Sequence, residues 1–218
     1  MKKSIAIFGI GRFGISLAKT LCHLGHQVLA VDVDEERIKI ADGYVTHTIQ
    51  ADSTDERALS QLGIRNFDYV VVSMGDDIRA SILTTVLCKE QGAKYLIAKA
   101  ADDLHAKLLY KTGADKVIQP ESEAGIRLAK SLVSENIIDY LDLSDEYSVH
   151  EIRIPKIWVG KTLAELDVRA KYDVSVIAVR RQSTIIVTLD PNEPFMVGDI
   201  IIMIGSNKGF EQICTLKS

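Results

Sequence analysis

Three glycines with the spacing Gly-x-Gly-x-x-Gly follow an apolar run near the start of the chain. The run is Ile5–Phe8, and the glycines are Gly9, Gly11 and Gly14. This order predicts a strand, a tight turn and a helix. Gly9 permits the turn, Gly11 lets a phosphate approach the backbone, and Gly14 lets the helix pack against the sheet. The helix N-terminus then offers unpaired N–H groups and a positive dipole end to an anion.

An acidic residue follows at the distance that completes this pattern. Asp32 closes the apolar run Val28–Val31, about 20 residues past the last glycine. A carboxylate there accepts hydrogen bonds from two ribose hydroxyls and repels a 2′-phosphate, which disfavours NADP. NAD, NADH, ATP, ADP and AMP all remain open. The alternative is a degenerate domain that has kept the turn and lost the ligand.

Short apolar strands alternate with amphipathic helices over the first 120 residues. Several strands are continuous apolar runs, such as Tyr69–Val72, as expected when helices cover both faces of a parallel sheet. We therefore predict an α/β fold with a doubly wound Rossmann-type parallel sheet, whose ligand crevice lies at the carboxyl ends of the strands. The predicted strands are residues 4–9, 27–32, 45–49, 68–73, 94–98 and 116–118.

The segment 121–141 has the apolar period of a long helix, and no strand follows it to complete a further crossover. Two interpretations are open: the helix lies back on its own sheet, or it crosses to a second subunit. Its apolar stripe consists of Leu128, Leu132, Val133, Ile137, Ile138 and Leu141.

The pattern changes after an acidic segment at 141–147, which we interpret as a linker. Short strands and turns then predict a small α+β domain. Its predicted strands are 148–154, 174–181, 184–188 and 199–204, with short helices near 162–168 and 207–215. We expect a nucleotide-binding domain over 1–140, ending in a crossover helix at about 121–140, and a ligand-binding or dimerisation subdomain over 141–218.

Composition argues against several classes of protein. The formal net charge is −4 and no basic block occurs, so a nucleic acid polymer is not an expected partner. No apolar run approaches the roughly 20 residues of a membrane helix. The chain also leads directly into its first strand, so we expect a soluble protein that reaches a membrane only through a partner. Three scattered cysteines suit a reducing cytosol.

The chain lacks the residue patterns of common catalytic sites. Its five histidines show no metal-ligand spacing, and no GxSxG elbow, Ser-His-Asp arrangement or GxxxxGK[ST] loop occurs. A sensor therefore fits better than an enzyme. The main alternative is an NAD-dependent oxidoreductase, which the small second domain disfavours. A redox-responsive transcription regulator is a third class, disfavoured by the net acidity and the lack of a helix-turn-helix segment.

Polar and charged residues lie in the glycine loop and at the strand ends that face the crevice. Taken singly, each is more often a solvated loop residue. Together, Arg12 and Lys99 would balance the charge of a polyphosphate, and Glu121 would face a bound cation. Asp52 would lie beside the adenine. The candidates are Arg12, Phe13, Asp52, Ser53, Lys99 and Glu121.

Several segments resemble the RCK domain, the regulator of conductance of K⁺. Those in the first domain are 7–14, 31–36, 50–55, 80–85 and 113–121. Those that resemble the RCK C-terminal subdomain are 160–163, 166–172 and 198–199. The resemblance covers nearly the whole chain and is strongest to the cytosolic regulatory subunits of bacterial Ktr potassium transporters.

The resemblance implies a cytoplasmic, non-catalytic regulator at the inner face of the cell membrane. It implies a homo-octameric ring, built from dimers joined partly through the helix at 121–140, that docks on a membrane potassium-translocating subunit. It implies that ATP activates the ring and ADP relaxes it, with NAD or NADH as further ligands. It assigns Arg12 to the terminal phosphate in the neighbouring subunit's site. It assigns Glu121 to a cation, Mg²⁺ or another, near the γ-phosphate.

The resemblance also implies that the C-terminal subdomains pair and that cyclic di-AMP binds in the cleft between them and inhibits the system. Related chains often carry asparagine where this chain has Ser175. The alternative is a cleft used only for dimerisation. The positions that match those lining the cleft are Arg169, Ser175, Val176, Ile177 and Pro191.

Overall fold

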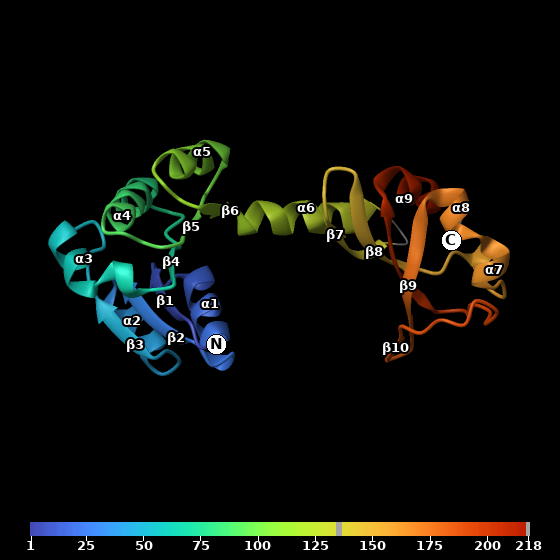
Figure 1. The fold of residues 1–218 in the computed structure, drawn as a ribbon, viewed down its shortest axis with the longest axis horizontal. Helices are drawn as coiled ribbons and strands as arrows, with labels where there is room; N and C mark the ends of the chain where they lie inside the picture. The colour runs from blue at the N-terminus through green and yellow to red at the C-terminus, as the bar shows by residue number, and fades with distance from the viewer. Residues whose placement is uncertain (134–136, 217–218) are drawn as a thin grey trace. The chain divides into compact units, whose positions relative to one another are not determined.

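The computed structural model describes residues 1–133 and 137–216. The chain divides into two compact units, Met1–Pro120 and Glu121–Ser218. Each unit is built around its own β-sheet, and Figure 1 labels the helices and strands of both.

The first unit contains a six-stranded parallel sheet with the strand order β3-β2-β1-β4-β5-β6. Its strands are β1 (Ser4–Phe8), β2 (Gln27–Asp32), β3 (His47–Gln50), β4 (Tyr69–Val72), β5 (Leu96–Lys99) and β6 (Lys116–Ile118). The connections are α1 (Arg12–His23), α2 (Glu35–Asp42), α3 (Glu56–Leu62), η1 (Ile64–Asn66), α4 (Ile78–Glu90) and α5 (Asp103–Lys111). The strand order reverses between β1 and β4, which confirms the predicted doubly wound Rossmann fold.

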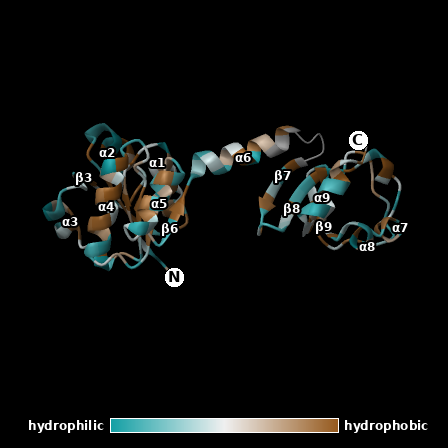
Figure 2. Cartoon of the chain, turned by 90° about the horizontal axis from the view of Figure 1, so that it is seen from above, coloured by the Kyte–Doolittle hydropathy of each residue, from teal (hydrophilic) through white to brown (hydrophobic). Residues whose placement is uncertain are grey.

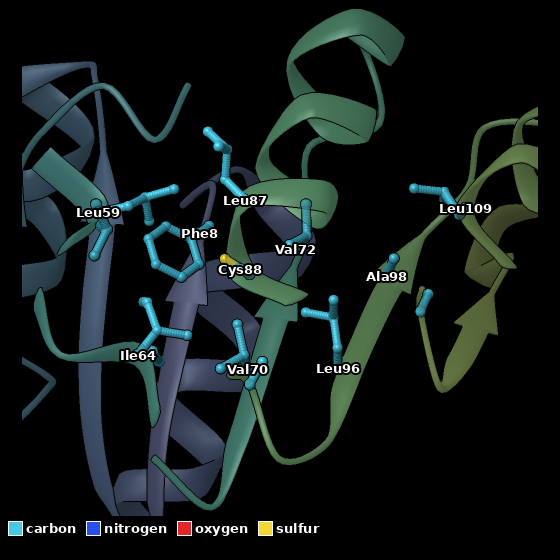
Figure 3. Close-up of a cluster of buried hydrophobic side chains, with 14 of the residues drawn as sticks. Phe8, Leu59, Ile64, Val70, Val72, Leu87, Cys88, Leu96, Ala98 and Leu109 are labelled. Carbon is cyan, nitrogen blue, oxygen red and sulfur yellow. The ribbon is translucent and has the colours of Figure 1, made fainter. Parts of the chain in front are cut away.

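Helices cover both faces of this sheet. On one face α3, α4 and α5 pack over the strands, and Figure 3 shows Phe8, Leu59, Ile64 and Cys88 within this apolar cluster. On the other face α1 and α2 cover a second cluster that includes Ile7 of β1. This two-sided burial explains why β1, β2 and β4 contain continuous apolar runs rather than alternating ones.

Four of the five helices in this unit begin with an aspartate cap. In each case the carboxylate accepts a backbone N–H of the first turn at 2.8–2.9 Å. The acid fills the place of a missing intrahelical acceptor and interacts favourably with the positive end of the helix dipole. The caps of α2, α3, α4 and α5 are Asp34, Asp55, Asp77 and Asp102.

The second unit contains a five-stranded antiparallel sheet with the order β10-β9-β11-β8-β7. Its strands are β7 (Ile137–Asp142), β8 (Tyr147–Arg153), β9 (Val174–Arg181), β10 (Thr184–Ile186) and β11 (Ile200–Ser206). Its helical segments are α6 (Pro120–Val133, with Pro120 the last residue of the first unit), η2 (Lys156–Trp158), α7 (Leu163–Leu166), α8 (Val168–Tyr172) and α9 (Asn207–Cys214). The core joins β8, β9 and β11 to the helices through residues such as Trp158, Met203 and Phe210. This arrangement confirms the small α+β subdomain.

The helix predicted over 121–141, or about 121–140 as a crossover helix, is wrong in its C-terminal part. α6 ends at Val133, residues 134–136 lie outside the described residues, and Ile137–Asp142 forms β7. Tyr140 lies opposite His150 of β8 and is buried, whereas the next residue, Leu141, is 61% exposed. The segment fits a helical period and, through Ile138, Asp139 and Tyr140, also a strand period. Pairing with β8 decides in favour of the strand, which aromatic and β-branched residues prefer.

The segment interpreted as an acidic linker, 141–147, is a hairpin instead. The N–H groups of Leu143 and Ser144 donate to the carbonyl of Tyr147, which closes the turn between β7 and β8. The two compact units divide between Pro120 and Glu121, whereas the functional domains are expected from the sequence to divide between residues 140 and 141.

A buried ion pair fastens the loop before β11 to β9. Asp199 is 1% exposed, and the Nε and Nη2 groups of Arg181 donate to its two carboxylate oxygens, each at 2.9 Å. The N–H of Met196 donates to the same carboxylate at 2.8 Å. Burial would raise the pKa of Asp199, but the hydrogen bonds from Arg181 and Met196 outweigh it and lower the pKa.

We predict that Arg181→Met destabilises the second unit by about 3 kcal/mol at pH 7, because Asp199 is left charged and unpaired in the core. The measurement is urea unfolding followed by the fluorescence of Trp158, the single tryptophan, which lies in this core. Arg153→Met, which removes an exposed arginine of the same sheet, is the control.

The difference between parent and Arg181→Met should depend on pH. Because the pKa of Asp199 is lowered in the folded chain, the pair contributes fully above the ordinary carboxyl pKa, about 4. Its contribution is lost as the pH falls below that range. A stability gap that is equal at pH 7 and pH 3 would contradict the assignment to this pair.

Candidate functional site

The glycine loop at the carboxyl end of β1 is fixed by backbone contacts. Gly9 has a φ of +90°, and its N–H donates to the carbonyl of Val31 at 2.8 Å. The hydroxyl of Ser73, directly after β4, donates to the carbonyl of Gly9 at 2.5 Å. A Cβ on Gly14 would lie only 2.1 Å from that same carbonyl oxygen. The loop, α1 and β4 therefore pack so closely that only glycine fits at position 14.

The N-terminus of α1 is open, unlike those of the four helices that follow. Its cap is Gly11, which provides no side chain to bond the N–H groups of the first turn. Apart from Gly11 itself and the adjoining backbone, no atom of the described residues lies within 4 Å of the place where a Gly11 Cβ would stand. A helix end with unbonded N–H groups and free space in front of it is a site for an anion such as a phosphate.

Asp32 lies beside this loop at the end of β2 and is 6% exposed. Its Oδ2 accepts the N–H of Ile10 at 2.6 Å, and its Oδ1 accepts the N–H of Asp34 at 2.9 Å. The guanidinium of Arg37 approaches Oδ2 at 3.5 Å. A carboxylate has about four acceptor positions, so Asp32 retains capacity for the hydroxyls of a ribose.

Two cationic residues and an aromatic ring belong to the same edge of the sheet. Arg12, the first residue of α1, is exposed. Lys99 ends β5, and its Nζ would lie 3.2 Å from a Cβ on Gly75, in the loop after β4. The same Nζ is 6.0 Å from the ring centroid of Phe13. The structure thus brings Lys99 and Phe13 together near the open helix end.

Asp52 and Ser53 follow β3 next to Asp32, since the N–H of Ala51 donates to the Asp32 carbonyl at 3.0 Å. Asp52 is exposed and accepts both the hydroxyl and the N–H of Thr54, and these hydrogen bonds lower its pKa. Ser53 is buried, and its hydroxyl bonds that of Thr84 in α4 at 2.9 Å. Asp52 is therefore accessible to a ligand, whereas the Ser53 hydroxyl fastens the loop to α4.

Glu121 is an exposed residue in the first turn of α6 and belongs to the second unit. Within residues 1–133 and 137–216, no group of three or more His, Cys, Asp or Glu side chains is placed to hold a metal ion. The cation expected at Glu121 stays a prediction.

The residues expected to line the C-terminal cleft all lie in the second unit. Arg169 is exposed on α8, and the carbonyl of Pro191 accepts the N–H of Ala164 in α7. Val176 packs against the core, while Ile177 is 43% exposed. The pairing of β9 with β11 shifts between Val176 and Ala178, so Ile177 is the extra residue of a β-bulge. Ser175 is half-buried on β9.

Two domain families match the chain: the TrkA-N domain over residues 5–120 and the TrkA-C domain over residues 149–218. The Ktr system potassium uptake protein C of Bacillus subtilis (strain 168) is 44% identical, covering 94% of this chain and 93% of that protein. Protein A of the same system and organism is 40% identical, covering 96% and 95%. The chain belongs to the RCK-domain family of Ktr potassium uptake proteins. This confirms the resemblance seen in the sequence.

Solved RCK structures share the fold of this Ktr-family chain. The RCK domain of GsuK superposes with a TM-score of 0.70 at 16% identity, over 99% of this chain and 48% of that one. The GsuK channel bound to NAD gives a TM-score of 0.72 at 16% identity, over 99% and 39%. Among the helices of the described residues, none has the length and apolarity to cross a membrane.

Two residues of the site, Ser73 and Arg37, were not predicted from the sequence. Ser73 fixes the carbonyl of Gly9, and the signal for it was its place directly after an apolar strand that neighbours β1. Arg37 approaches Asp32, but it stands in a run of charged residues on α2, and no sequence pattern separates it from the others.

We predict opposite effects for two substitutions in the glycine loop. Gly14→Ala should destabilise the first unit by about 2–3 kcal/mol, because its Cβ would overlap the Gly9 carbonyl. Gly11→Ala should change stability by less than about 1 kcal/mol, because its position is open. It should nevertheless weaken ADP binding by occupying the space for a phosphate. Thermal unfolding with and without ADP measures both effects, and equal destabilisation by the two variants would contradict this account.

Proposed function

We propose that the chain is the cytosolic nucleotide-sensing gating subunit of a Ktr-type potassium uptake system. The observation that carries the proposal is the open N-terminus of α1 beside the buried carboxylate of Asp32. This pair suits a ligand with a phosphate and a ribose at one end, such as ATP, ADP, NAD or NADH. The Ktr relatives at 40–44% identity supply the transport context.

The proposed mechanism is differential binding without a catalysed reaction. The helix end and Asp32 hold the inner phosphate and the ribose of either nucleotide. Arg12 is exposed and reaches the terminal phosphate of a triphosphate bound in a neighbouring subunit, with Glu121 supporting a cation such as Mg²⁺ near the γ-phosphate. ADP lacks that phosphate. ATP and ADP therefore favour two different shapes of the assembly by their difference in affinity.

The assembly proposed is a homo-octameric ring built from dimers. A groove of about 320 Å³ lies along the first sheet beside α1. Its apolar lining comes from Phe13, Leu17, Leu21, Val71, Ile97 and Ile118, with Lys3 and Lys116 also lining it. An apolar groove with cationic lining residues suits an amphipathic helix that carries acidic residues.

Helix α6 has these properties. It carries both hydrophilic and hydrophobic residues along its length (Figure 2), and Ile126, Leu128 and Leu132 are 52%, 59% and 75% exposed. Its first turn contains Glu121 and Glu123, which complement the lysines of the groove. We infer that α6 of a second copy occupies the groove, so that the helix joins the two chains of a dimer. The ring would dock on a membrane potassium-translocating subunit at the cytoplasmic side.

We predict that Arg12→Ala reduces the distinction between ATP and ADP more than it reduces ADP binding. Loss of a charge-assisted hydrogen bond should weaken ATP binding about tenfold or more, because such a bond contributes roughly 1.5–3 kcal/mol. Calorimetric titration with each nucleotide measures the affinities. Potassium flux in vesicles containing the regulator and its membrane subunit measures the response.

Arg65→Ala is the control, since Arg65 is exposed in η1, which precedes β4 at the opposite edge of the sheet. A variant lacking Arg12 that still discriminates ATP from ADP as the parent does would reject the role of Arg12.

We also propose that the second units pair around cyclic di-AMP, which inhibits the system. A two-fold interface suits a symmetric dinucleotide, since both halves meet the same residues. Arg169 is exposed and free to approach a phosphate, and Ile177 presents an apolar surface to a base. Ser175 and Pro191 complete the proposed lining.

Calorimetry of the full chain, with the first unit saturated by ADP, tests this proposal. We predict one cyclic di-AMP per two chains, and about tenfold weaker binding or more for Arg169→Ala. Arg153→Ala, an exposed arginine in the same unit, should bind as the parent does. Equal affinity for the Arg169→Ala variant would leave the cleft as a dimer contact only.

A further inference from the structure

The contact between Arg37 and Asp32 bears on which nucleotides the site accepts. Arg37 lies on α2 and directs its Nη1 at Oδ2 of Asp32 and its Nε at Oδ2 of Asp34, each at 3.5 Å. The side chain of Asp32 is 4% exposed and that of Arg37 is 50% exposed. Arg37 therefore spans from the buried acid to solvent at the ribose end of the site.

The other cation of this helix is engaged elsewhere. Lys39 pairs with Glu35 and Glu36, each at 3.0 Å. Among the ion pairs of the described residues, Arg37 is thus the cation of α2 that reaches Asp32. A half-exposed guanidinium at this place has the planar donors that hold a phosphate in a bidentate manner.

We propose that Arg37 and Asp32 together determine the selection of the ribose, with Asp32 neutralising an arginine that would otherwise accept a 2′-phosphate. In the parent chain Asp32 repels a 2′-phosphate and forms an ion pair with the guanidinium of Arg37. When the carboxylate of Asp32 is removed, Nη1 of Arg37 loses its partner while Nε stays beside Asp34. Arg37 then becomes a ligand for a phosphate, and the site accepts adenosine phosphates that carry a 2′-phosphate. This inference rests on the proposed nucleotide site and names a specificity-determining residue within it.

The turn after β2 also has contacts that do not use the Asp32 side chain, and these remain when position 32 changes. Gln50 of β3 donates its side-chain N–H to the carbonyl of Val33 at 3.1 Å. The N–H of Ala51 donates to the carbonyl of Asp32. Both contacts use main-chain groups of the turn after β2, which persist when the side chain at position 32 changes.

The experiment compares ADP with 2′-phospho-ADP, which differ only in the group that Arg37 would meet. Affinities are measured by calorimetry for the parent, Asp32→Ser and the double variant Asp32→Ser with Arg37→Met. We expect the parent to bind ADP much more tightly than 2′-phospho-ADP. In Asp32→Ser the ratio of these two affinities should fall about tenfold or more. The double variant should lose the gained affinity for 2′-phospho-ADP. Adding Lys39→Met to Asp32→Ser in place of Arg37→Met is the matched control and should retain it.

Two further variants keep the test decisive if Asp32→Ser folds poorly. Asp32→Asn has the same size without the charge and should show a gain for 2′-phospho-ADP that again depends on Arg37. Arg37→Met alone should widen the parent's preference for ADP, since Asp32 then repels the 2′-phosphate without a neighbouring cation.

The possible outcomes distinguish a failure of the proposed nucleotide function from a failure of the inference about Arg37. A parent chain that binds no ADP would overturn the proposed nucleotide function and this inference with it. ADP binding without any gain for 2′-phospho-ADP in Asp32→Ser or Asp32→Asn would overturn this inference alone. A gain that survives Arg37→Met would also overturn it, because the gain would then come from lost repulsion and not from the released arginine.

Discussion

The hydrogen bonds accepted by Asp32 hold together the edge of the first sheet on which the proposed site depends. A carboxylate buried this deeply is costly unless N–H groups or cations satisfy its oxygens. Here the N–H groups of Ile10 and Asp34 come from two different loops, so one side chain fixes the glycine loop against the turn after β2. The ribose acid of the proposed site is thus also a structural residue, and its geometry is set before a ligand arrives.

The helices of the first unit differ in whether a side chain caps their N-terminus. The chain supplies its own anion at α2 to α5, where an aspartate accepts a first-turn N–H. At α1 it supplies none, because Gly11 is the cap and space lies in front of it. Since the same sequence caps its other helices consistently, the open end of α1 is better understood as a place for an external anion than as a weakness of the fold.

The first unit could be predicted from the sequence because several of its strands, such as β1 and β4, are continuous apolar runs and helix signals separate the strands. The end of α6 could not, since Ile137–Asp142 fits both periods and only the neighbouring strand β8 distinguishes them. Within the site, Gly9, Gly14 and Asp32 follow from spacing alone. The hydrogen bond between the hydroxyls of Ser53 and Thr84 depends on how α4 packs against the sheet. No pattern in the sequence indicates this bond.

The open end of α1 has a consequence for the lifetime of the protein. A ligand that binds only the folded chain stabilises it by an amount that grows with the free ligand concentration, about 2.7 kcal/mol at a hundred times the dissociation constant. Both nucleotides of the proposed function complete the same helix end, so either one protects the first unit against local opening and proteolysis. Under the proposed function, the abundance of the chain would then follow the total adenine nucleotide pool, while its state would follow the ratio of ATP to ADP.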